Sequence, residues 1–132
     1  YQYTRLTNIL LDHKVQQCEL ESNAGGSRIA YEVRNRIESE GGRCNVTEKP
    51  TETNKETRII VNSDWIKRHV LFKESERYTP KSDYGKMMKF IQTYSIVGKN
   101  KFDDVPDGLA NFALFVNGKR YKRKTKIIGC PF

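Results

Sequence analysis

The chain has 132 residues, of which 36% are hydrophobic and 30% charged, a composition that predicts one folded domain with a modest core and excludes a disordered chain. No stretch approaches the roughly 20 apolar residues that a membrane-spanning helix needs, and no signal-peptide pattern opens the sequence. The net charge of +8 favours a polyanionic partner, for which nucleic acid is the first expectation.

The cysteines and histidines are scattered along the chain. Cys18, Cys44 and Cys130 are far apart and odd in number, no CxxC pair occurs, and His13 and His69 are isolated. We therefore expect neither a disulfide framework nor a structural zinc site, and we expect a reducing compartment. The first residue is Tyr1 rather than Met, which predicts that the sequence is a segment of a longer protein.

The first fifty residues show two helical patterns, each followed by a strand pattern. Thr4 is the predicted N-cap of the first helix, and residues 15–21 read as a strand that ends in a polar, glycine-rich turn. Ser27 is the predicted N-cap of the second helix, which Gly41 and Gly42 end, and residues 43–48 form the next predicted strand. The expected apolar faces of the two helices are Leu6, Ile9, Leu10 and His13, and Ile29, Ala30, Val33 and Ile37.

The rest of the chain is predicted to be largely helical. A third helix starts at Asn54, residues 70–72 form a brief strand, and residues 81–94 and 105–116 form two more helices. Alternation of this kind predicts an α/β fold with parallel strand pairing. Ligands of such sheets lie beyond the carboxyl ends of the strands, which is the place expected for Glu21.

Two acidic groups stand apart from the other carboxylates. Glu21 ends the first predicted strand, and Asp103, Asp104 and Asp107 lie where the last helix begins. One interpretation is structural: aspartates cap helix N-termini, and a glutamate at a strand end is solvated. The other is catalytic, because carboxylates hold Mg²⁺ or Mn²⁺ in two-metal nucleases. The motifs of phosphate-binding loops, dinucleotide sites and serine hydrolases are absent.

Five segments of the sequence match one family in their order. They are ELESNAGG (19–26), TNKETRI (53–59), WIKRHVLF (65–72), SDYGKMMKFIQTY (82–94) and KNKFDDVPDGLA (99–110). Over nearly its whole length the chain resembles the C-terminal nuclease domain of phage and prophage terminase large subunits.

The resemblance implies an α/β fold of the ribonuclease H-like type, with a mixed sheet flanked by helices and a two-metal Mg²⁺ or Mn²⁺ site. Such a domain is an endonuclease that cuts concatemeric, double-stranded viral DNA during genome packaging, in the cytoplasm of the bacterial host. The parent protein works with a portal and a small terminase subunit, and no membrane is involved. Glu21 corresponds to the second catalytic acid and Asp104 to the last, with Asp103 and Asp107 as alternatives. Where relatives often carry a histidine, this chain has Phe102.

The family's first acid, and the N-terminal strands that carry it, have no counterpart here. The resemblance therefore implies that the segment is inactive alone and that the predicted strand 15–21 has an unpaired edge.

The expected domain plan is a nuclease domain at 1–117 and a basic tail at 118–132. The predicted DNA contacts fall into two groups, one near the active face and one in the tail; they are Lys55, Arg58, Lys67 and Arg68, and Lys119, Arg120, Lys122, Arg123 and Lys124. The tail is alternatively a solvated end. Two alternatives for the whole chain are a non-catalytic DNA-binding or packaging-motor assembly module, and another ribonuclease H-like enzyme such as a resolvase or transposase.

Overall fold

The computed structural model describes residues 2–51 and 53–128, and the side chains of all of these except 24 and 119–128. The chain divides into two compact units, Tyr1–Glu52 and Thr53–Phe132. The described residues form five α-helices and a two-stranded parallel sheet. This confirms the predicted mixed α/β class and the predicted parallel pairing.

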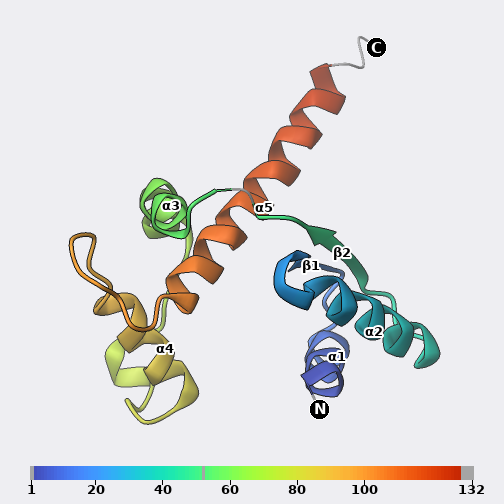
Figure 1. The fold of residues 1–132 in the computed structure, drawn as a ribbon, viewed down its shortest axis with the longest axis horizontal. Helices are drawn as coiled ribbons and strands as arrows, with labels where there is room; N and C mark the ends of the chain where they lie inside the picture. Colours follow the sequence, from blue (N-terminus) through green and yellow to red (C-terminus); the bar gives the residue numbers. More distant parts are fainter. Residues whose placement is uncertain (1, 52, 129–132) are drawn as a thin grey trace. The chain divides into compact units, whose positions relative to one another are not determined.

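The first unit is a strand–helix–strand arrangement preceded by a helix (Figure 1). Its elements are α1 (Gln2–Asp12), β1 (Gln17–Glu21), the short 3₁₀ helix η1 (Asn23–Gly25), α2 (Gly26–Ser39) and β2 (Asn45–Lys49). In the sheet, Cys18 lies opposite Val46 and Glu21 opposite Lys49. Parallel strands need a crossover connection, and α2 supplies it.

The core of this unit lies between the two helices and one face of the sheet. Its buried members come from α1, α2 and β2, and are Leu10, Ala30, Val33, Ile37 and Val46. The half-buried Cys18 and Leu20 of β1 pack against them, whereas Glu19 and Glu21 are exposed. Alternation along β1 therefore directs the Glu21 side chain away from the core.

Two predicted helix starts in this unit are wrong. Thr4 lies inside α1 rather than before it. His13, which was predicted to belong to the apolar face of this helix, follows its last residue. Ser27 is the second residue of α2, whose N-cap is Gly25 in the left-handed region at φ 87°. At Gly26 a Cβ atom would overlap the backbone carbonyl oxygen of Glu21. The two glycines of ELESNAGG are thus required by the turn from β1 into α2.

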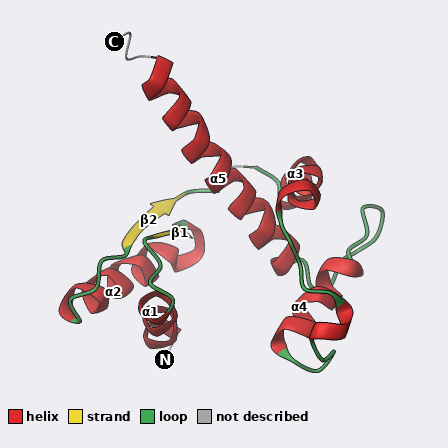
Figure 2. Ribbon diagram, turned by 180° about the vertical axis from the view of Figure 1, so that it is seen from behind, coloured by secondary structure: helices red, strands yellow, loops and turns green. Residues whose placement is uncertain are grey.

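The second unit consists of helices joined by loops. It contains α3 (Lys55–His69), the 3₁₀ helix η2 (Ser75–Arg77), α4 (Asp83–Gln92) and α5 (Asp104–Ile128). The predicted start of α3 is confirmed, because the Asn54 side-chain oxygen accepts hydrogen bonds from the backbone N–H groups of Glu56 and Thr57. Helix α5 packs against both α3 and α4 (Figure 2). Buried apolar side chains at these contacts are Ile59, Ile66, Met88, Ala110 and Ala113.

Two further expectations for this unit need correction. Residues 70–72 are an irregular segment rather than a strand, and the Leu71 side chain is 97% exposed. Helix α5 starts at Asp104 and continues to Ile128, well past the end predicted at residue 116. The helix therefore runs through the basic segment, whose side chains from Lys119 onward lie outside the described residues. No helix in the described part of the chain is long and apolar enough to cross a membrane.

Candidate metal and nucleic-acid site

Asp103 and Asp104 direct their carboxylates at one cationic group. The Lys55 ammonium lies 3.1 Å from Oδ1 of Asp103 and 3.0 Å from Oδ1 of Asp104. Lys55 is the first residue of α3 and Asp104 the first of α5, so two helix N-termini bring these groups together. The backbone carbonyl of Asp103 accepts the first intrahelical hydrogen bond of α5, from the N–H of Asp107. The positive end of the α5 dipole favours carboxylates at this place.

The Lys55 ammonium remains charged over the whole neutral range. Its hydrogen bonds with Asp104 and Asp103 raise the pKa of Lys55 above its usual value. A raised folded-state pKa means that the stabilisation is fully present below the unfolded pKa, about 10.4 for lysine, and is lost as pH rises through the folded value. Deprotonation of Lys55 therefore does not open the contact at neutral pH.

The Lys55 contacts are open to solvent, which limits their contribution to stability. Side-chain exposure is 38% for Lys55, 30% for Asp103 and 93% for Asp104. Exposed ion pairs contribute about 0–1 kcal/mol. We expect Lys55→Ala to lower the free energy of unfolding by less than about 1 kcal/mol, measured by urea denaturation. A loss of several kcal/mol would contradict the exposed geometry.

Asp107 has a different environment, because it is buried with Arg58. The Arg58 Nε donates to Oδ1 of Asp107 at 2.7 Å, and its second terminal nitrogen lies 2.6 Å from the same oxygen. The remaining guanidinium nitrogen donates to the Thr53 carbonyl at 2.7 Å. The two side chains are 4% and 11% exposed. Arg58 therefore ties α3 to α5 inside the protein and presents no surface to a phosphate.

Glu21 belongs to the other unit and lies at the carboxyl end of β1, where it was expected. Its Oε1 accepts a hydrogen bond from Nδ2 of Asn23 at 3.2 Å, and the same nitrogen donates to the Thr51 carbonyl. The side chain is exposed. Its expected proximity to Asp104 stays a prediction. Among the side chains that the structure describes, no three His, Cys, Asp or Glu residues converge on a common point.

The predicted basic contacts divide into inward and outward groups. Lys55 and Arg58 share a face of α3, as predicted, and that face is turned toward the start of α5. Lys67 and Arg68, in the last turn of α3, are exposed, and Arg68 pairs with Asp64 at 2.7 Å. The side chains of the tail group, Lys119, Arg120, Lys122, Arg123 and Lys124, lie outside the described residues.

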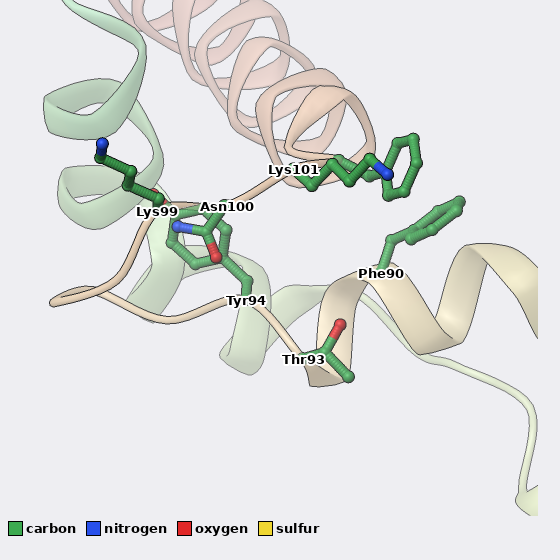
Figure 3. A pocket seen from close by; sticks show the side chains of 7 residues that line it. Phe90, Thr93, Tyr94, Lys99, Asn100 and Lys101 are labelled. Carbon is green, nitrogen blue, oxygen red and sulfur yellow. The ribbon is translucent and has the colours of Figure 1, made fainter.

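A pocket near Asp103 and Asp104 was not predicted from the sequence. This small pocket of about 160 Å³ lies between the end of α4 and the loop before α5, lined by Phe90, Thr93, Tyr94, Lys99, Asn100, Lys101 and Phe102 (Figure 3). Burial raises the pKa of Tyr94, and the nearby carboxylates of Glu56, Asp103 and Asp107 raise it further. Tyr94 therefore stays a neutral phenol at neutral pH. The pocket adjoins Asp103 and Asp104, because its lining residue Phe102 directly precedes them in the chain. The sequence signal was the alternation of lysines and an aromatic residue in KNKF.

Comparison of the chain with protein-family models, curated proteins and solved structures finds no significant match. The resemblance to terminase nuclease domains thus stays an expectation drawn from the five sequence segments.

Proposed function

We propose that this chain is part of a metal-dependent DNA endonuclease of the ribonuclease H-like type, in which Asp103 and Asp104 hold a Mg²⁺ or Mn²⁺ ion. The observation that carries the proposal is the convergence of these two carboxylates on one cationic centre, the Lys55 ammonium. Mg²⁺ commonly binds through one or two carboxylates, with waters and substrate phosphates completing its shell. The exposed Asp104 side chain leaves room for such ligands.

The roles of the other residues follow from their surroundings. A bound ion supplies an activated water and neutralises charge at the scissile phosphate. If the two aspartates held an ion, the Lys55 ammonium would be placed to pair with the phosphate. Asp107 does not fit the ligand set, because two nitrogens of Arg58 contact its Oδ1 atom in a buried pair. Glu21 enters as the second acid on the resemblance alone.

The biological setting of the proposal also rests on the resemblance. It comprises cutting of concatemeric double-stranded viral DNA during packaging, and a portal and a small terminase subunit as partners. Lys67 and Arg68, both exposed in the last turn of α3, suit sequence-independent phosphate contact.

Mn²⁺ titration by calorimetry tests the metal site without requiring cleavage. Asp104→Asn removes a charged ligand, and we expect it to weaken Mn²⁺ binding about tenfold or more. Lys55→Ala removes the competing cation, and we expect it to tighten binding roughly fivefold. Weaker Mn²⁺ binding by Asp104→Asn together with tighter binding by Lys55→Ala would indicate that Lys55 and the metal compete for the same two carboxylates.

A second aspartate–lysine pair at a helix start provides a matched control. Asp83 begins α4, is 94% exposed, and lies 3.8 Å from the Lys86 ammonium. Asp83→Asn should leave Mn²⁺ binding unchanged. Equal, weak binding by wild type, Asp104→Asn and Asp83→Asn would overturn the metal site.

The second candidate is a non-catalytic DNA-binding or packaging-motor assembly module. It is favoured by the observation that Asp103 and Asp104 share the Lys55 ammonium and that Asp107 pairs with Arg58, so two of the three negative charges are compensated without a metal. In that case the acids serve only to join α3 to α5. The Lys55→Ala titration separates the two candidates, because a purely structural pair gives no gain in Mn²⁺ affinity.

A further inference from the structure

The loop between α4 and α5 holds aromatic and cationic groups in a fixed arrangement. The Asn100 side chain accepts from the backbone N–H of Ser95 at 2.9 Å and donates to the Ser95 carbonyl at 2.7 Å, which closes the loop on itself. Its amide also donates to the Gly98 carbonyl at 3.3 Å. These bonds hold the backbone of the loop that carries Lys99 and Lys101.

The aromatic part of the pocket is open on one side. The rings of Phe90 and Phe102 have centroids 5.2 Å apart and are tilted by 39°. Phe102 is 56% exposed, and the Lys101 ammonium lies 5.4 Å from the centre of its ring. The contact between the Lys101 ammonium and the exposed Phe102 ring is a cation–π interaction, so one aromatic platform and one cation lie side by side at the surface.

We infer that this pocket binds one unpaired nucleotide of a DNA strand, with the base stacked on Phe102 and the phosphates held by Lys99 and Lys101. Single-stranded nucleic acid is bound by this combination of aromatic platforms and basic side chains. The inference rests on the proposed function in taking DNA as the partner.

The size of the pocket argues for part of a strand rather than a free ligand. Its volume of about 160 Å³ is below the roughly 300–1,000 Å³ of pockets that enclose a whole small molecule. A single base of an extended strand needs only enough space for its ring system, and the adjacent nucleotides of the strand remain outside the pocket. Because Phe102, which lines the pocket, directly precedes Asp103 in the chain, a base stacked on Phe102 lies near the proposed metal ligands.

Fluorescence anisotropy with a labelled oligodeoxythymidine, in EDTA, tests the inference apart from any metal. We expect Phe102→Ala to raise the dissociation constant about tenfold, since base–aromatic stacking contributes about 1–3 kcal/mol. Phe102→Trp should retain the affinity of the wild type. Replacing both Lys99 and Lys101 with alanine should lower the salt slope by about 1.4, or about 0.7 for each lost phosphate contact.

Two control variants have matching chemistry elsewhere in the same unit. Phe112 of α5 is 50% exposed, and the Lys73 ammonium lies 5.2 Å from the ring centre of Tyr84. Phe112→Ala and Lys73→Ala should both bind the oligonucleotide as the wild type does. If Phe112→Ala weakens binding as much as Phe102→Ala, the pocket is not the site.

The same measurements separate this inference from the nuclease proposal. Binding of the oligonucleotide that depends on Phe102, without Mn²⁺ binding at Asp104, upholds the pocket and overturns the metal site. Mn²⁺ binding that responds to Asp104→Asn and Lys55→Ala, with oligonucleotide affinity indifferent to Phe102→Ala, overturns the pocket and upholds the metal site.

Discussion

Replacing Arg58 with methionine is expected to lower the free energy of unfolding of the second unit by about 3–5 kcal/mol. The change leaves the Asp107 carboxylate buried without its partner, and it also deprives the Thr53 carbonyl of a donor. Removing one member of a buried ion pair costs far more than the pair contributes, because the remaining charge has lost its hydration and gained nothing in return. Urea denaturation followed by the fluorescence of Trp65, the single tryptophan and a residue of α3, measures the loss.

The controls for Arg58→Met use the same substitution at the surface and the removal of both charges. Arg68→Met breaks the pair with Asp64, whose partners are 71% and 69% exposed, and should cost no more than about 1 kcal/mol. Arg58→Met combined with Asp107→Leu removes the stranded carboxylate and should recover much of the stability. Equal losses in Arg58→Met and Arg68→Met would contradict the buried geometry.

Local signals in the sequence were sufficient for most of the fold. The apolar spacing of residues 29–37 and the order strand–helix–strand predicted a parallel pair, and β1 and β2 form one. The third helix was predicted to start at Asn54, and α3 begins one residue later, at Lys55. The predicted elements that are wrong lie where a local sequence preference competes with a contact made in the folded structure. Ser27 is a good capping residue, yet the close approach of Gly26 to the Glu21 carbonyl starts α2 earlier. The Val-Leu-Phe run at 70–72 has strand-forming side chains, but no strand of the described residues pairs with it.

The candidate site shows why single residues were harder to assign than elements. Lys55 and Arg58 were expected to contact DNA, and Asp103 and Asp107 to hold metal, yet the structure pairs these two groups with each other. The partners are 48 and 49 residues apart in the chain, a separation at which one sequence gives no pairing signal. The acidic cluster was correctly located at the start of the last helix. The sequence did not indicate that Asp104 is exposed whereas Asp107 is buried.

Replacing Gly26 with alanine is expected to destabilise the first unit by more than about 3 kcal/mol, above the usual range for overpacked sites. A methyl group at this position meets the backbone of Glu21, and a backbone carbonyl cannot rotate away as a side chain does. Relief requires β1 and the start of α2 to move apart, which disturbs the core around Ala30 and Val46. Urea denaturation followed by far-ultraviolet circular dichroism, with hydrogen exchange of the α2 amides, measures the effect and locates it.

Gly108 provides the matched control for Gly26→Ala. It lies within α5, and a Cβ atom there meets nothing within 4 Å. Gly108→Ala should therefore stabilise the protein by roughly 0.5–1 kcal/mol, the helix preference of alanine over glycine. Opposite signs at the two glycines would establish that the ELESNAGG turn depends on a close backbone contact, independently of any catalytic role for Glu21. If Gly26→Ala unfolds at the same urea concentration as the wild type, the close contact between α2 and the end of β1 is wrong, and the placement of Glu21 at that strand end has lost its structural basis.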